Sequence, residues 1–155
     1  LGMGDAILKT RKSKYFNDIS DILLIWGDLP FITRTSLDKL IYNHFKHSNF
    51  MTILSYKTKN PYTLIVKDKN DYVCDLIETK LTNKKFNYGE RDLGVFLFKK
   101  DLLNYLYKNK KIQNSEHNFL YIIKILYKLG FKIKSLPIAK HKETISLNYI
   151  SDLNK

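Results

Sequence analysis

The residue best placed for chemistry in this 155-residue chain is Asp28, which ends the apolar run DILLIWGD at residues 21–28. Such a run is typical of a buried strand in a mostly parallel sheet. Ligands of open α/β sheets bind outside the carboxyl ends of the strands. A carboxylate at that place suits a magnesium ion held by one or two protein oxygens and by substrate phosphates. The alternative is that Gly27 and Asp28 only turn the chain ahead of Pro30, and these residues alone do not decide between the two.

A second feature is the glycine-spaced stretch LGMGDA at residues 1–6, which leads into a segment with helical potential. Two glycines allow backbone N–H groups to approach a nucleotide near the start of a helix. A lone Gly-x-Gly is more often a turn, so the stretch gains weight only in combination with other motifs.

These residues need a sheet to position them, and the apolar pattern predicts one. Strands are expected at residues 21–28, 50–56, 62–68, 72–78, 93–100 and 132–139, and helices at 36–47, 100–109 and 118–131. Ser36 is expected to cap the first helix, Asn70 and Asp71 to form a tight hairpin, and Pro137 to place the last strand at an edge. The order favours one α/β domain over residues 1–155, a sandwich around a mixed, mainly parallel sheet.

Composition narrows the class of function. The net charge is +12, but only Arg11, Arg34 and Arg91 among the 27 cations are arginines, which indicates a compositional bias rather than a nucleic-acid surface. A single cysteine, Cys74, excludes an internal disulfide and a multi-cysteine zinc site. No apolar run approaches the roughly 20 residues that span a bilayer, and the start lacks signal-peptide character, so a cytoplasmic protein is expected.

The four histidines show no metal-binding spacing. His44 and His47 are expected to be solvated residues on adjacent helical turns. His117, within SEHNF at residues 115–119, is interpreted as part of a helix entry in which Ser115 or Asn118 is the cap. No catalytic role is assigned to it.

Six short motifs together resemble the sugar-1-phosphate nucleotidyltransferases. They are LGMGDA, LLIWGDLPFI, PYTLIV, LIETK, ERDLGVFLF and SLNYISDL, in the order and approximate spacing of that family over nearly the whole chain. The resemblance is greatest to the uridylyltransferase domain that makes UDP-N-acetylglucosamine. It implies a Rossmann-like nucleotidyltransferase fold, which transfers a nucleoside monophosphate from a nucleoside triphosphate to a sugar 1-phosphate and releases pyrophosphate.

The resemblance also implies the residues of the site. Asp28, as the catalytic residue, and Asn148 would hold Mg²⁺. The nucleotide would lie against Gly2, Met3, Gly4, Trp26 and Gly27. The sugar phosphate would lie against Tyr62, Thr63, Glu78 and Asp92. In-line attack on the α-phosphate depends on positioning and magnesium and needs no protein nucleophile, so the absence of a Ser-His-Asp or Cys-His set is consistent with this chemistry.

The sequence departs from the family pattern at three of these positions. Met3 replaces a threonine that reads the base, Thr63 replaces a glycine beside the sugar, and Asp92 replaces an asparagine. An acceptor other than N-acetylglucosamine 1-phosphate is therefore expected, and the base stays open. Family members also carry, ahead of LGMGDA, a first strand and a glycine-rich loop that hold the triphosphate. The chain is accordingly interpreted as the C-terminal two-thirds of the family domain, N-terminally truncated, lacking the first βα unit and inactive by itself.

Two alternatives remain at this stage. One is a non-catalytic domain of the same fold that binds a nucleotide sugar or a partner protein. The other is a basic nucleic-acid-binding module, whose affinity would fall steeply as salt rises. The favoured partners are a nucleoside triphosphate and a sugar phosphate, with no nucleic acid and no membrane, and the oligomeric state is not predicted.

Overall fold

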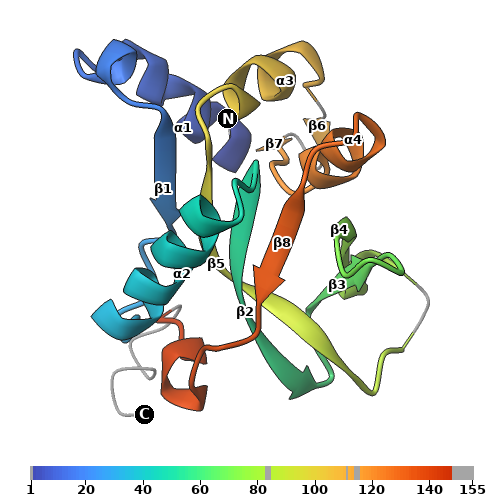
Figure 1. The fold of residues 1–155 in the computed structure, drawn as a ribbon. Helices are drawn as coiled ribbons and strands as arrows, with labels where there is room; N and C mark the ends of the chain where they lie inside the picture. Colours follow the sequence, from blue (N-terminus) through green and yellow to red (C-terminus); the bar gives the residue numbers. More distant parts are fainter. Residues whose placement is uncertain (1, 83–84, 111, 114–115, 148–155) are drawn as a thin grey trace.

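A four-stranded sheet in the order β1-β5-β2-β8 forms the centre of the computed structural model, which describes residues 2–82, 85–110, 112–113 and 116–147 (Figure 1). The sheet strands are β1 (Asp21–Ile25), β2 (Met51–Lys59), β5 (Tyr88–Lys99) and β8 (Ile133–Leu136). Two further pairs are β3 (Thr63–Lys67) with β4 (Val73–Glu78), and β6 (Ile112–Gln113) with β7 (Glu116–His117). The helices are α1 (Met3–Leu8), α2 (Arg34–Lys46), α3 (Leu102–Lys108) and α4 (Ile122–Lys128). Short 3₁₀ turns lie at Lys9–Lys12, Phe16–Asp18, Thr79–Leu81 and His141–Thr144.

The sheet is mixed, which confirms the predicted α/β class. β2 and β8 are parallel, whereas β5 runs antiparallel to both β1 and β2. The described part of the sheet thus has less parallel pairing than the sequence suggested, because β5 follows the β3–β4 hairpin and re-enters the sheet between β1 and β2. The β2–β5 register shifts between Ile53 and Ser55, where β5 supplies the residues from Asp92 to Phe96.

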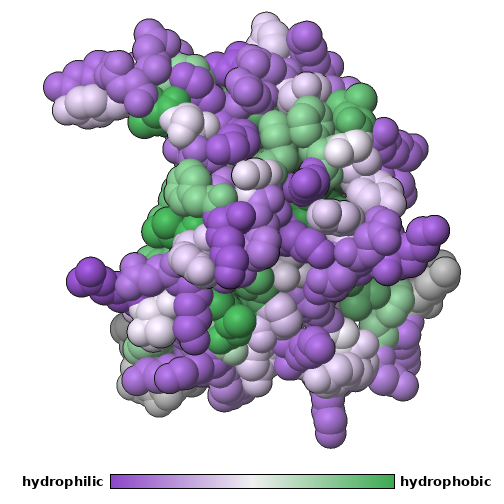
Figure 2. Space-filling model, in the orientation of Figure 1, coloured by the Kyte–Doolittle hydropathy of each residue, from purple (hydrophilic) through white to green (hydrophobic). Residues whose placement is uncertain are grey.

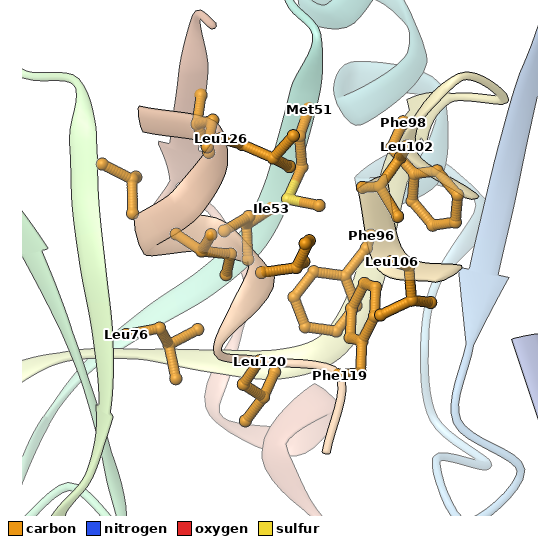
Figure 3. Close-up of a cluster of buried hydrophobic side chains, with 14 of the residues drawn as sticks. Met51, Ile53, Leu76, Phe96, Phe98, Leu102, Leu106, Phe119, Leu120 and Leu126 are labelled. Carbon is orange, nitrogen blue, oxygen red and sulfur yellow. The ribbon is translucent and has the colours of Figure 1, made fainter. Parts of the chain in front are cut away.

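Both faces of the sheet are covered, because side chains on β5 alternate between two cores. Phe96 and Phe98 face α3 and α4, where Phe119 meets Phe96 edge-to-face at 5.3 Å between ring centroids (Figure 3). Val95 and Leu97 face the opposite side, where they pack in a cluster with Leu40, Leu54, Leu93 and Ala139. The result is a helix–sheet–helix sandwich, with α2 on one side and α3 and α4 on the other (Figure 1).

Some local predictions hold and others are wrong. A hairpin does form at Asn70 and Asp71, where Asp71 has a φ of 62°, and β8 is an edge strand ahead of Pro137. The cap of α2 is Thr33 rather than Ser36, because the Thr33 side chain accepts the Ser36 backbone N–H. The helix predicted at 118–131 is limited to Ile122–Lys128.

β1 is not the buried strand that its apolar run suggested. It lies at the edge of the described sheet, paired with β5 alone, and the side chains of Leu23 and Ile25 are each 39% exposed. An apolar run therefore identified the strand but not its place in the sheet.

His44 corrects a second prediction, because it is fully buried instead of solvated. Its Nδ1 lies 2.9 Å from Thr52 Oγ1 and its Nε2 lies 3.0 Å from Asp21 Oδ1. Lys99 Nζ lies 3.0 Å from the same Asp21 oxygen. Burial of the imidazole is the main reason that the pKa of His44 is lowered. His47, at the end of α2, is exposed as expected.

Hydrophilic side chains cover most of the face drawn in Figure 2, with hydrophobic side chains in smaller patches. Among the described residues, no helix has both the length and the apolar character that crossing a membrane requires.

Candidate functional site

A cavity of about 440 Å³ brings together residues from both predicted halves of the site. From the predicted nucleotide side it has Met3, on α1, and Trp26, which follows β1. From the predicted sugar side it has Tyr62 and Thr63 at the start of β3, and Glu78 at the end of β4. The remaining lining residues are Lys80, Leu81, His117, Asn118 and Leu120. We refer to this space as the central cavity.

Trp26 owes its position to Gly94. The Trp26 backbone N–H donates to the Gly94 carbonyl at 3.0 Å, and the indole ring lies directly on the Gly94 Cα, so that a methyl group there would overlap the ring. Gly94 has a φ of 73°, which glycine adopts without strain. The indole Nε1 is buried and has no hydrogen-bond partner among the described residues.

Asp92 does not line the central cavity, but it is hydrogen-bonded to Thr63, which does. Its Oδ1 accepts a hydrogen bond of 2.5 Å from Thr63 Oγ1, and its Oδ2 accepts one of 2.9 Å from the Gly94 backbone N–H. The side chain is fully buried, and this burial raises the pKa of its carboxyl group. Asp92 therefore fixes Thr63, which lines the central cavity, and the backbone of Gly94, against which the Trp26 ring packs.

Asn118 holds Glu78 in place across the central cavity. Its Nδ2 donates to Glu78 Oε1 at 2.7 Å, while its Oδ1 accepts the Leu120 backbone N–H at 2.8 Å. From the sequence, Asn118 was expected only as a helix cap, and His117 had no predicted role. The linear sequence contains no signal for either, because their partners lie 40 and 112 residues away.

Asp28 lies at a neighbouring cavity of about 330 Å³, which it lines with Trp26, Leu29, Tyr62, Arg91, Leu93, Thr144 and Ser146. The Arg91 guanidinium carbon lies 4.6 Å from the centre of the Tyr62 ring, and Arg91 also donates to the Thr144 carbonyl at 3.2 Å. The Leu147 backbone N–H donates to the Asp28 carbonyl at 2.8 Å. Asn148, the second predicted metal ligand, directly follows Leu147 but lies outside the described residues.

The donor set at Asp28 fits magnesium better than a transition metal. Within the described ranges, no three His, Cys, Asp or Glu side chains gather as a metal site. Mg²⁺ does not require one, because it commonly keeps several waters and is bound by one or two carboxylates together with substrate phosphates. No described side chain makes a hydrogen bond or an ion pair with the Asp28 carboxylate, which leaves its oxygens available.

Of the predicted glycines, Gly27 lines one of the cavities, whereas Gly2 and Gly4 are not among their lining residues. Gly2 precedes α1, and Gly4, within α1, packs against the ring of His117. Gly27 and Asp28 line a third, more apolar cavity of about 610 Å³ that runs along α1 and β1. Trp26 contributes to all three cavities, so it stands where they meet.

No family model matches the sequence. Curated relatives do. The bifunctional protein GlmU of Buchnera aphidicola subsp. Acyrthosiphon pisum (strain Tuc7) is 30% identical over 161 residues, which cover 99% of this chain and 34% of that protein. This chain is homologous to GlmU. The GlmU of Streptococcus thermophilus (strain ATCC BAA-491 / LMD-9) is 29% identical over 153 residues, covering 96% of this chain and 33% of that protein. The resemblance inferred from the six motifs is thereby confirmed.

The chain spans about a third of the length of these GlmU proteins. Among solved structures, HddC from Yersinia pseudotuberculosis superposes with a TM-score of 0.62 and 17% sequence identity. That match covers 99% of this chain and 60% of HddC, and it establishes a shared fold.

Proposed function

We propose that this chain forms the nucleotide- and sugar-binding part of a nucleotidyltransferase. The reaction is transfer of a nucleoside monophosphate from a nucleoside triphosphate to a sugar 1-phosphate, with release of pyrophosphate. One observation carries the proposal: Met3, Trp26, Tyr62, Thr63 and Glu78, which are far apart in the sequence, line one central cavity. Its volume of about 440 Å³ lies in the range of small-ligand sites. The homology with GlmU supports the same class of reaction.

The side chains suggest a division of labour. Glu78, held by Asn118, presents a carboxylate that accepts hydrogen bonds from sugar hydroxyls. Trp26 offers an apolar ring face between the central cavity and the cavity at Asp28. Asp28, with Asn148 from the far end of the chain, would hold a Mg²⁺ ion, which neutralises phosphate charge when it is bound.

The acceptor is proposed to differ from N-acetylglucosamine 1-phosphate. The Thr63 side chain occupies space at the central cavity that a glycine would leave open, and its hydroxyl is already committed to Asp92. Asp92 has both carboxylate oxygens bound within the chain, so it offers no free polar group to an acetamido substituent. A smaller substituent at that ring position suits this wall better.

The test measures ligand binding by this chain and turnover by the full-length protein. Trp26 is the sole tryptophan of the chain and lines the cavity, so its fluorescence reports on bound nucleotides and sugar 1-phosphates. Pyrophosphate release is then measured with Mg²⁺, each common nucleoside triphosphate and a panel of sugar 1-phosphates. Release with a sugar 1-phosphate other than N-acetylglucosamine 1-phosphate supports the proposal.

Three other outcomes test separately the proposed acceptor, the catalytic role and the assignment of the cavity. Best turnover with N-acetylglucosamine 1-phosphate contradicts the proposed acceptor. Binding without pyrophosphate release supports the non-catalytic alternative of a nucleotide-sugar-binding domain. No fluorescence response to any nucleotide or sugar phosphate contradicts the assignment of the central cavity.

A further inference from the structure

The central cavity contains a buried imidazole nitrogen that the fold itself leaves unused. His117, on β7, lines the central cavity and is fully buried, and its Nε2 has no hydrogen-bond partner among the described residues. The indole Nε1 of Trp26, another lining residue, is in the same state. Buried polar atoms are rarely left without partners, because their desolvation is then uncompensated. Two such atoms on residues of one cavity indicate partners that arrive with a ligand.

The other nitrogen of His117 is held by Asp5, on α1. His117 Nδ1 lies 3.1 Å from Asp5 Oδ1, and Lys110 Nζ lies 3.1 Å from the same oxygen. Hydrogen bonds from Lys110 and His117 lower the pKa of Asp5, so its side chain is a carboxylate. A carboxylate only accepts hydrogen bonds, which places the imidazole proton on Nδ1. In that tautomer of the imidazole, Nε2 has a lone pair that can accept a hydrogen bond.

Packing fixes the ring as well. A Cβ at Gly4 would lie 2.6 Å from the Cγ of His117 and 2.8 Å from its Nδ1, closer than real Cβ contacts allow. The absence of a side chain at Gly4 thus lets α1 approach the imidazole. Asp5 and Gly4, which are consecutive on α1, together set the position and tautomer of His117.

We propose that His117 is a ligand-binding residue of the central cavity and that Asp5 is its positioning residue. His117 Nε2 accepts a hydrogen bond from a donor on the nucleotide sugar, either a hydroxyl group or a ring N–H of the base. The inference rests on the proposed function, since it concerns the ligand of the same cavity. It adds a specificity element that neither the six motifs nor the GlmU homology identified.

The central experiment replaces His117 with phenylalanine, which keeps an aromatic ring and removes both nitrogens. His47→Phe is the matched control, because His47 is exposed at the end of α2, away from the cavities. The substitution also removes the Nδ1–Asp5 hydrogen bond, so the melting temperature of the free protein is expected to fall modestly. Removing a ligand contact is expected to weaken binding of UDP-glucose by about 10-fold, the effect of one hydrogen bond. A purely structural histidine would lower stability as well but would leave the affinity for UDP-glucose unchanged.

Two fragments of that ligand identify the donor. A loss of affinity in His117→Phe for UMP, with glucose 1-phosphate unaffected, assigns the donor to the nucleoside. A loss for glucose 1-phosphate alone assigns it to the sugar. Gly4→Ala tests the same contact from α1, and it is expected to weaken the same fragment, because the added methyl group displaces the imidazole.

A spectroscopic measurement guards against misfolded variants. In ¹⁵N NMR spectra of the unaltered protein, His117 is expected to have its proton on Nδ1, and UDP-glucose is expected to shift the Nε2 resonance. A proton on Nε2 in the free protein, or unchanged affinity in His117→Phe while the unaltered protein binds, overturns this inference and leaves the proposed function standing. Failure of the unaltered protein to bind UDP-glucose, UMP, glucose 1-phosphate and every other nucleotide and sugar 1-phosphate of the panel overturns both.

Discussion

Replacing Gly94 with alanine should damage stability and ligand binding together, because Gly94 is where β5 touches Trp26. The added Cβ would overlap the indole ring, and the φ of 73° is unfavourable for any residue with a side chain. A non-glycine residue in the left-handed region costs about 1–2 kcal/mol. Overpacking against a fixed neighbour costs about 1–3 kcal/mol more. We therefore expect Gly94→Ala to lower the free energy of unfolding by about 2–5 kcal/mol.

The expected change in melting temperature follows from the chain length. Unfolding entropy near 60 °C is about 2.1 cal/mol/K per residue, so for 155 residues a loss of 1 kcal/mol lowers the melting temperature by about 3 °C. Gly94→Ala should therefore melt about 6–15 °C below the unaltered protein. Circular dichroism measures this, and the fluorescence of Trp26 reports whether the indole has moved.

Gly27→Ala is the stability control, since a Cβ at Gly27 meets no atom within 4 Å. It should melt within about 2 °C of the unaltered protein, as surface substitutions usually change stability by no more than about 0.5 kcal/mol. Equal melting temperatures for Gly94→Ala and Gly27→Ala, with an unshifted Trp26 emission, would show that the indole does not depend on Gly94.

Three further predictions concern the metal, the buried histidine and the core. In the full-length protein, Asp28→Asn should lower Mg²⁺-dependent pyrophosphate release by about 100-fold or more, since a bound metal ion is worth several kcal/mol. Asp38→Asn, on the exposed side of α2, should not lower it, and an equal loss in both variants refutes the ligand assignment. Because the pKa of His44 is lowered in the folded protein, the unfolded chain takes up a proton on this side chain at a higher pH than the folded protein does. The free energy of unfolding should therefore fall as the pH drops below about 6.5. His44→Gln should make this fall shallower in thermal melts, and an unchanged slope counts against the buried neutral imidazole. Phe119→Ala should lower the free energy of unfolding measured in urea by about 3–5 kcal/mol. Phe45→Ala, at a ring that is 53% exposed, should lower it by less than about 1 kcal/mol. Similar losses in the two variants would contradict the edge-to-face packing of Phe119 in the core.

The elements of the fold were largely predictable because their signals are local. An apolar run identified the strand at 93–100, and Asn70 with Asp71 identified the hairpin between β3 and β4. Positions within the sheet were not predictable, because they depend on which strands pair. The apolar run that contains Ile25 suggested a buried strand, yet β1 lies at the edge of the described sheet and Ile25 is exposed.

Only part of the candidate site could be predicted from the sequence, because the rest depends on contacts between residues that are far apart in the chain. The family resemblance implied that Tyr62, Thr63 and Glu78 lie together, and in the structure they line one cavity. Asp28 and Trp26 also lie at adjoining cavities. The roles of these residues in binding stay predictions.

Buried polar pairs could not be found from spacing. His44 shares a helix with exposed neighbours, and only its contact with Asp21, 23 residues earlier, shows that it is buried. His117 likewise gains a role only from Asp5, which lies 112 residues away in the sequence. A polar side chain on an apolar element is therefore better interpreted through its partner than through its periodicity.

The shift in register within β5 connects these features. Asp92, at one end of it, binds Thr63 in the lining of the central cavity and the backbone N–H of Gly94. Gly94 in turn supports Trp26, which borders all three cavities. A bulge of this kind re-aims side chains without interrupting the strand, and here it couples the cavity wall at Thr63 to the indole ring of Trp26. A substitution at Asp92 should consequently alter Thr63 and Trp26 together, so the departure from asparagine at this position changes the shape of the whole site rather than one contact.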